Sequence, residues 1–254
     1  MAMKQDTHEK STIQRYPIGF RYPKSNPLDL RSYRYARAGN TLNCGAGAHL
    51  GFTQDVAFRD VTVDLAAAGK RTLVVTIVGG VGGDGRLSNG AIGANDLAGG
   101  YIIIFPNGMA DIMNRMIVAN TATIAGGGAM TITVDKPLTV ALSPNPHAEI
   151  IANPYLDVLY GNYDKQMIVG MPTVVADVGE FIWLQTWGPT WGIPGGVVWD
   201  EAENSLAMFD GSGSIEAFDE ATPVNGAHQI AGTIMSPLLG GGSGAPFLFL
   251  QIAP

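Results

Sequence analysis

The segment Met130-Thr-Ile-Thr-Val134 alternates apolar and polar side chains, and Asp135-Lys-Pro-Leu138 follows it directly. Strict alternation places the apolar side chains on one face of a β-strand and the threonines on the other. Aspartate and proline are typical of the turn after such a strand. This stretch therefore predicts a half-buried strand of an antiparallel sheet that ends in a turn.

Similar short apolar runs recur along the chain at spacings of about ten residues, separated by Gly, Pro, Asn or Asp, as in sandwiches and barrels. With 34 glycines among 254 residues, long helices are disfavoured. We therefore expect an all-β fold, an antiparallel β-sandwich or barrel with long Gly-rich loops at Gly79–Gly100 and Gly240–Gly244. The expected strands include Val61–Leu65, Thr72–Val78, Tyr101–Phe105, Met113–Ala119, Leu138–Leu142, Ile150–Ala152, Leu156–Tyr160, Met167–Val169, Phe181–Thr186, Val197–Trp199, Ile230–Met235 and Phe247–Ile252.

Charge is divided unevenly along the chain. Residues 1–40 carry eight basic and three acidic side chains, a net charge of +5, whereas residues 41–254 carry a net charge of −12. The first segment also contains Pro17, Pro23 and Pro27, which disfavour helix. We expect residues 1–40 to form an extended basic N-terminal arm and residues 41–254 to form a single β-rich body.

Arginine and aromatic residues alternate along this arm, and both types are enriched where proteins contact one another. The acidic body and the absence of a nucleic-acid-binding motif argue against a nucleic acid as the partner. We expect the arm to bind a neighbouring protein through Arg15, Tyr16, Phe20, Arg21, Tyr22, Arg31, Tyr33, Arg34, Tyr35 and Arg37.

No motif in the chain indicates catalysis, a cofactor or a metal. The sequence Gly80-Val-Gly-Gly-Asp-Gly85 fits the glycine spacing of a dinucleotide-binding loop, but no helix is expected after it. Ser243 does not fit the hydrolase nucleophile pattern, because Ala245 stands two residues after it where that pattern requires glycine. A single cysteine, Cys44, excludes sites built from several cysteines. The histidines show no metal-ligand spacing, and we interpret the acidic clusters as solvated turns: His8, His49, His147 and His228; Asp200, Glu201 and Glu203; Asp219 and Glu220.

Four tryptophans lie within a short segment, interspersed with Gly and Pro: Trp183, Trp187, Trp191 and Trp199. Large aromatic side chains of this kind form a core corner, an anchor between subunits or a platform that stacks against sugars. All three interpretations stay open at this point. The platform is the basis of an alternative function, a glycan- or receptor-binding module.

Two further features bear on location. No apolar run reaches the roughly 18 residues that a membrane-spanning helix needs. The N-terminal sequence Met1–Lys10 is polar and lacks the apolar region of a secretory signal, so we expect synthesis in the cytoplasm.

Residues 99–191 contain an ordered succession of strand and turn motifs. They include Gly99-Gly-Tyr-Ile-Ile-Ile, Asn114-Arg115, Gly126-Gly-Gly128, Asn153-Pro-Tyr155 and Phe181-Ile-Trp-Leu-Gln-Thr-Trp-Gly188. This succession resembles β-rich virion proteins of tailed bacteriophages, of the head decoration or minor capsid type. The segment from Arg34 to Gly47 is similar to the entry of those proteins into their first sheet.

The resemblance implies a non-enzymatic protein of the virion that binds and stabilises the capsid shell as a decoration, cement or minor capsid protein. It implies contacts with the major capsid protein or other virion proteins and a homo-oligomer, with a trimer favoured. Charged residues make up only 15% of the chain, against about 25% in average proteins, which agrees with a surface partly covered by neighbours. Deletion of residues 1–36 is then expected to abolish particle binding without unfolding the body.

Overall fold

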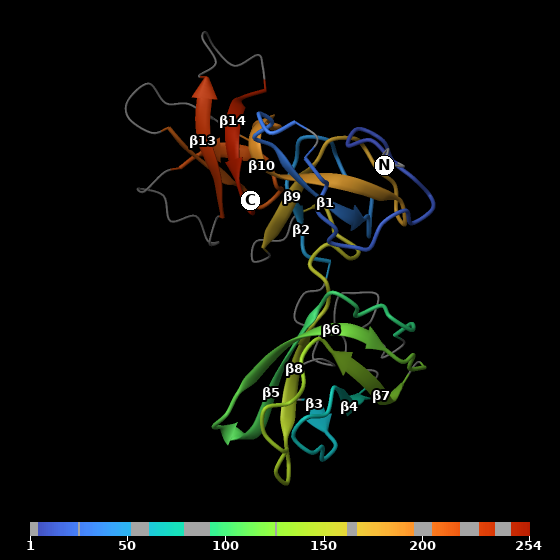
Figure 1. Ribbon diagram of the computed structural model, residues 1–254. Coiled ribbons are helices and arrows are strands. Elements are labelled where there is room, and N and C mark those ends of the chain that lie inside the picture. The colour runs from blue at the N-terminus through green and yellow to red at the C-terminus, as the bar shows by residue number, and fades with distance from the viewer. Residues whose placement is uncertain are drawn as a thin grey trace. The chain divides into compact units, whose positions relative to one another are not determined.

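The chain is all-β. A computed structural model describes residues 5–24, 26–51, 61–78, 92–124, 126–161, 167–195, 205–218, 229–236 and 245–254. Its regular elements are fourteen β-strands, which confirms the predicted fold class (Figure 1). No helix in these ranges is long and apolar enough to cross a membrane. The chain divides into two compact units: unit 1 is Met1–Gly51 with Tyr155–Pro254, and unit 2 is Phe52–Pro154.

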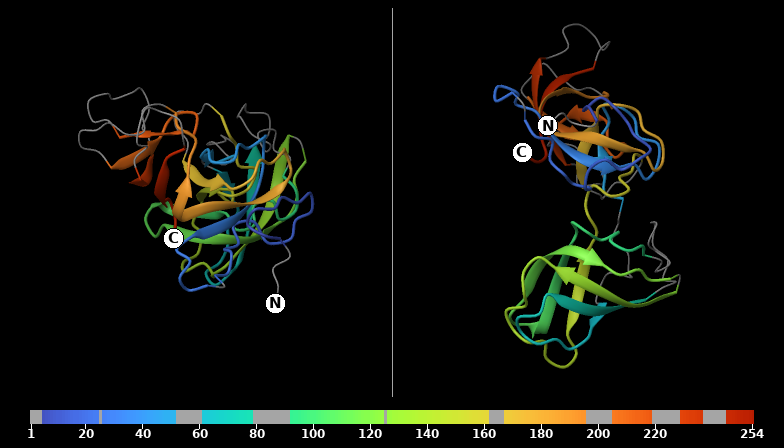
Figure 2. Two further views of the ribbon diagram at one scale, coloured as in Figure 1. Left: turned by 90° about the horizontal axis from the view of Figure 1, so that it is seen from above. Right: turned by 45° about the vertical axis from the view of Figure 1, so that its right-hand side comes forward.

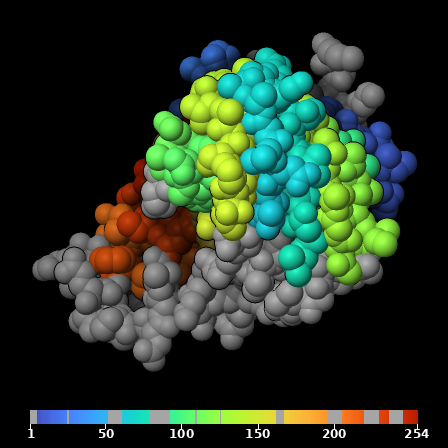
Figure 3. All heavy atoms as spheres, turned by 90° about the horizontal axis from the view of Figure 1, so that it is seen from below, coloured from blue at the N-terminus to red at the C-terminus, as the bar shows by residue number. Residues whose placement is uncertain are grey.

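Unit 2 is a closed antiparallel barrel. Its strands follow the spatial order β3-β4-β7-β6-β5-β8, and the pairing of β3 with β8 closes the ring (Figure 2). Figure 3 shows the surface of these two neighbours, β3 in cyan and β8 in yellow-green. The strands are β3 (Val61–Val63), β4 (Thr72–Val78), β5 (Tyr101–Met109), β6 (Met113–Asn120), β7 (Gly127–Val134) and β8 (His147–Ile151).

Alternating side chains fill the barrel, as the sequence predicts. In β7, Met130, Ile132 and Val134 are buried, whereas Thr131 and Thr133 between them are only half-buried. β7 pairs with β4 along the whole length of β4, whose inward side chains join the same core. The pleat of these two strands therefore creates the apolar interior.

One end of the predicted Gly79–Gly100 loop packs into this barrel. Ile92 and Leu97 are fully buried in its core, and the side chain of Asn120 holds the segment between them. The Asn120 amide donates to the Gly93 carbonyl and its oxygen accepts from the Leu97 N–H, both at 2.9 Å. Residues 79–91 and the predicted loop at Gly240–Gly244 lie outside the described residues.

Unit 1 is built on a curled antiparallel sheet. Its order is β12-β11-β13-β14-β10-β9-β2, and β1 pairs with β10 beside this path. The strands are β1 (Ser32–Arg37), β2 (Ala48–His49), β9 (Ile168–Pro172), β10 (Phe181–Trp191), β11 (Leu206–Phe209), β12 (Ile215–Ala217), β13 (Ile230–Ser236) and β14 (Phe247–Gln251).

The long strand β10 joins the two halves of this sheet. Its first part, Phe181–Trp187, pairs with β1, and its second part, Trp187–Trp191, pairs with β14. Gly188 lies just after the point where the partner of β10 changes from β1 to β14. Its φ is +91°, and a Cβ at this position would lie 2.8 Å from the Leu30 carbonyl oxygen. Only glycine fits this position without strain, because both its backbone angle and its surroundings exclude a side chain.

This organisation differs from the expected arm and single body. β1 lies within the predicted arm but is a strand of unit 1. Unit 2, which contains the barrel strands, is inserted in the sequence between the two segments of unit 1. β1 forms because Ser32-Tyr-Arg-Tyr-Ala-Arg37 follows the last proline of the segment and alternates as a strand does. The change in charge near residue 40 therefore does not mark a domain boundary, because β1 before it and β10 after it belong to the same sheet.

Candidate interaction surface

The aromatic residues of the N-terminal segment pack around Trp183. This side chain lies on β10 opposite Tyr35 of β1, and both are fully buried. The ring centroids of Tyr35, Tyr22 and Tyr16 lie 4.9, 5.0 and 5.3 Å from that of Trp183. Aromatic rings at these separations attract one another beyond the effect of area burial. We call this group, with Tyr33 and Phe181, the aromatic cluster.

Hydrogen bonds satisfy the Tyr35 hydroxyl of this cluster. The Tyr35 hydroxyl donates to the Gln5 side-chain oxygen at 2.9 Å and accepts from the Arg15 N–H at 3.1 Å. Gln5 itself donates to the Phe181 carbonyl at 2.9 Å. Burial raises the pKa of both Tyr33 and Tyr35, so both phenols stay neutral at physiological pH.

The backbone of the segment extends the sheet of unit 1. Residues 19–22 run antiparallel to β1, with hydrogen bonds from Gly19 to Tyr35, from Tyr35 to Phe20 and from Tyr22 to Tyr33. Ser11 exchanges two hydrogen bonds with Phe181 at 3.0 and 2.8 Å. The segment is thus extended locally, as expected, but it lies on its own chain.

The predicted partner-binding residues divide into three classes. Tyr33 and Tyr35 are buried; Tyr16, Tyr22, Arg34 and Arg37 are half-buried; Arg15, Phe20, Arg21 and Arg31 are exposed. The two buried tyrosines belong to the core of unit 1, which corrects their expected role as contacts to another protein. Phe20, 41% exposed and stacked on Tyr16, is the arm aromatic that presents most surface.

Several basic side chains of the segment meet acidic partners within unit 1. Arg37 forms a bidentate ion pair with Asp157, with 2.8 Å between Nη2 and Oδ2, and the two side chains are only 17% and 12% exposed. Lys10 lies 2.8 Å from Glu180, and their hydrogen bond lowers the pKa of that carboxyl. These pairs fasten both ends of the segment to residues of the C-terminal half.

The tryptophans do not share one environment. Trp183 is in the core, Trp187 is half-buried beside Phe249, and Trp191 is 45% exposed. A Cβ on Gly45 would lie 2.5 Å from the Trp191 ring, so this ring rests on the glycine backbone. Trp199 lies outside the described residues. Among the three tryptophans that the structure describes, the core interpretation therefore holds for Trp183 only.

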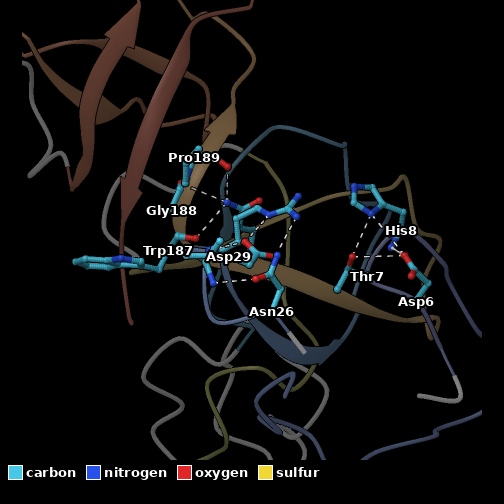
Figure 4. A network of polar contacts seen from close by, with 11 residues as sticks. Asp6, Thr7, His8, Asn26, Asp29, Trp187, Gly188 and Pro189 are labelled. Carbon is cyan, nitrogen blue, oxygen red and sulfur yellow. Dashed lines mark hydrogen bonds and ion pairs between the residues drawn. The ribbon is translucent and has the colours of Figure 1, made fainter. Parts of the chain in front are cut away.

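A polar network lies at the change of partner in β10, after Trp187. The Gln185 amide donates to the carbonyls of Trp187, Gly188 and Pro189, at 3.1, 3.3 and 2.9 Å (Figure 4). In the same figure Asp29 accepts two hydrogen bonds from the Arg31 guanidinium, which lower the pKa of Asp29. The Gln185 Nε2 contacts hold the backbone at the partner change in β10.

Within the described part of the chain, no group of three or more His, Cys, Asp or Glu side chains is arranged to hold a metal ion. His8 is exposed, His49 is buried and His147 is half-buried. His228, Asp200, Glu201, Glu203, Asp219, Glu220, Gly80–Gly85 and Ser243 lie outside the described residues. Burial raises the pKa of Cys44, which disfavours the reactive thiolate.

The outer wall of the barrel carries an exposed apolar row that sequence reasoning missed. Tyr101 on β5 lies directly opposite Met116 on β6 and Ile151 on β8, so the three side chains share the outer face. They are 45%, 38% and 52% exposed. The outward positions of these strands are mixed, since Asn114 on β6 and Glu149 on β8 are exposed as well. The strand patterns therefore carried only a weak signal, an apolar outward residue on each of the three strands, and their register brings these residues together.

No known family model, curated protein or solved structure matches this chain.

The candidate surface therefore rests on geometry alone. It comprises the apolar row of unit 2 and, separately, the exposed basic residues on the N-terminal segment of unit 1.

Proposed function

We propose that this chain is a non-enzymatic structural protein of a tailed-phage particle, which binds and stabilises the capsid shell as a decoration, cement or minor capsid protein. The apolar row Ile151–Tyr101–Met116 is the observation that carries the proposal. Contiguous exposed apolar side chains mark interaction sites, and Tyr and Met are enriched at the centres of protein interfaces. The resemblance of residues 99–191 to phage virion proteins indicates the kind of partner.

The closed barrel suits this row for a rigid contact. Each of the three side chains stands on a strand whose neighbours are fixed by the ladder, and their inward neighbours are buried. Such a surface loses little conformational entropy on binding. In this proposal the partners are the major capsid protein or other virion proteins. The chain forms a homo-oligomer, with a trimer favoured. It is made in the host cytoplasm and then located in the virion.

The alternative of a glycan- or receptor-binding module loses part of its basis. Trp183 is fully buried and cannot belong to a surface platform. Of the remaining tryptophans in the described residues, Trp187 is half-buried and Trp191 is exposed. The apolar row therefore supports a protein contact better than the tryptophans support a sugar site.

Replacement of Tyr101 by Asp is expected to reduce incorporation of the chain into particles by tenfold or more. A carboxylate at the centre of an apolar contact loses its hydration without gaining a partner, which weakens binding. A loss of about 1.4 kcal/mol in binding free energy lowers the affinity tenfold. Incorporation is measured by competition between tagged variant and wild-type chains during particle assembly, followed by quantitative immunoblotting of purified particles.

Leu65→Asp is the matched control, because Leu65 is another exposed apolar residue of unit 2, with 66% of its surface accessible. Its incorporation is expected to equal that of the wild type. Equal incorporation of Tyr101→Asp, in a chain whose circular dichroism spectrum is native, would show that the apolar row makes no contact in the particle.

A further inference from the structure

Two arginines of the N-terminal segment stand side by side on neighbouring strands. Arg21 pairs with Arg34 of β1 in an antiparallel bridge. The backbone hydrogen bonds on either side run from the Tyr22 N–H to the Tyr33 carbonyl and from the Tyr35 N–H to the Phe20 carbonyl. Arg21 and Arg34 are therefore a non-hydrogen-bonded pair of the ladder. Pairs of this type have the shortest separation in an antiparallel ladder, with Cβ atoms about 4.5–5.5 Å apart.

This placement is unfavourable for the isolated chain. Like charges directly opposite each other in a sheet are destabilising. Neither arginine forms an ion pair among the described residues, whereas Lys10, Arg31 and Arg37 of the same segment each do. Arg21 and Arg34 therefore place two like charges opposite each other without an acidic partner among the described residues. Such an uncompensated unfavourable placement is typical of a functional site.

The polar contacts of the pair leave most of its donors available. Arg21 Nη2 donates to the Ser32 hydroxyl and Arg34 Nη1 donates to the Gly19 carbonyl, both at 3.3 Å. Arg34 Nε is buried and has no hydrogen-bond partner among the described residues. Each guanidinium carries five N–H donors, so an oxyanion between the two would receive several charge-assisted hydrogen bonds.

We propose that Arg21 and Arg34 together bind an oxyanion, and that in the assembled protein this oxyanion is a carboxylate of a second copy of the chain. Charge complementarity identifies the source, because residues 41–254 carry a net charge of −12 and the first 40 residues carry +5. The same negative charge repels the phosphate backbone of a nucleic acid. The inference rests on the proposed function, since a shell component must contact neighbouring subunits.

The first arm of the test probes the site in the intact chain with inorganic phosphate. Thermal unfolding of unit 1 is followed by tryptophan fluorescence in phosphate and in chloride of equal ionic strength. The wild-type midpoint is expected to rise saturably by about 2–4 °C, because a ligand of the folded state alone stabilises it. Arg21→Gln is expected to lose the rise, and Lys24→Gln, an exposed basic residue nearby, is expected to keep it. An equal rise in wild type and Arg21→Gln would overturn the oxyanion site.

The second arm identifies the source of the carboxylate by sedimentation velocity of the full chain at low salt. Wild type is expected to self-associate, with dissociation constants about tenfold higher for Arg21→Gln and unchanged for Lys24→Gln. Phosphate is expected to compete with association. A monomer at all concentrations, or association that Arg21→Gln leaves unchanged, would overturn the second copy as the source. Neither arm involves particles, so failure here is distinct from failure of Tyr101→Asp to alter incorporation.

Discussion

A chain that lacks residues 1–36 is expected to lose the fold of unit 1 while unit 2 stays folded. The deletion removes every residue of β1 except Arg37, and it also removes the tyrosines of the aromatic cluster. Trp183 is then uncovered, and the Phe181–Trp187 part of β10 loses its partner strand. Truncation of one large buried aromatic costs about 3–5 kcal/mol, and a folded domain has a net stability of about 5–15 kcal/mol. Loss of Tyr33 and Tyr35 together with the strand therefore exceeds what unit 1 can tolerate.

Fluorescence separates the two units in this experiment. All four tryptophans follow residue 154, so their emission reports unit 1 alone. The truncated chain is expected to show the red-shifted emission of exposed tryptophan, while amide hydrogen exchange in β4 and β7 remains slow. Leu28→Ala, at a residue 84% exposed in the same segment, is the control and is expected to keep native emission. Native emission in the truncated chain would contradict this prediction and support the expectation from the sequence that the body stays folded without residues 1–36.

Asp157→Asn is expected to destabilise unit 1 by about 3 kcal/mol, since removal of one partner of a largely buried ion pair leaves the other charge uncompensated. The Arg37–Asp157 pair links β1 to the segment by which the chain returns from unit 2. Asparagine keeps the shape of the side chain and tolerates the backbone of residue 157, where φ is +51°. The measurement is urea unfolding followed by tryptophan emission.

The matched control is Asp29→Asn, which breaks a bidentate Arg–Asp pair of the same chemistry whose side chains are 44% and 31% exposed. An exposed pair contributes about 0–1 kcal/mol, so this variant is expected to change stability by less than the first. The double variant Arg37→Met with Asp157→Asn is expected to recover part of the loss, because no buried charge is then unpaired. Equal effects of Asp157→Asn and Asp29→Asn would show that the Arg37 pair is not buried in solution.

Strand patterns were predictable wherever alternation decided them. β7 follows Met130-Thr-Ile-Thr-Val134 as expected, and β4 has the predicted bounds Thr72–Val78. The predicted strand Leu138–Leu142 consists of bends and irregular backbone, and the predicted strand Leu156–Tyr160 consists of bends and two isolated bridges. The predicted strand Val197–Trp199 lies outside the described residues. Leu138 and Leu142 instead contribute to the barrel core, because a short apolar run between prolines can bury its side chains without joining a ladder.

The candidate site was predictable only in part. Alternating Tyr and Arg in the N-terminal segment indicated contact residues, but not that Tyr33 and Tyr35 pack with Trp183 of the same chain, some 150 residues away. Sequence spacing carries no information about which strand becomes the neighbour. The pairing of Arg21 with Arg34 and the row at Tyr101 arise from sheet register, which depends on the whole fold.

The most direct test of a structural role is to quantify this chain by mass spectrometry in purified virus particles produced from the genome that encodes it. A shell component is expected in a fixed stoichiometric ratio to the other capsid proteins across independent preparations, and to remain after washing at a salt concentration that removes weak surface contacts. Absence from the particles, or a trace amount that varies between preparations and washes away, would contradict the proposed function.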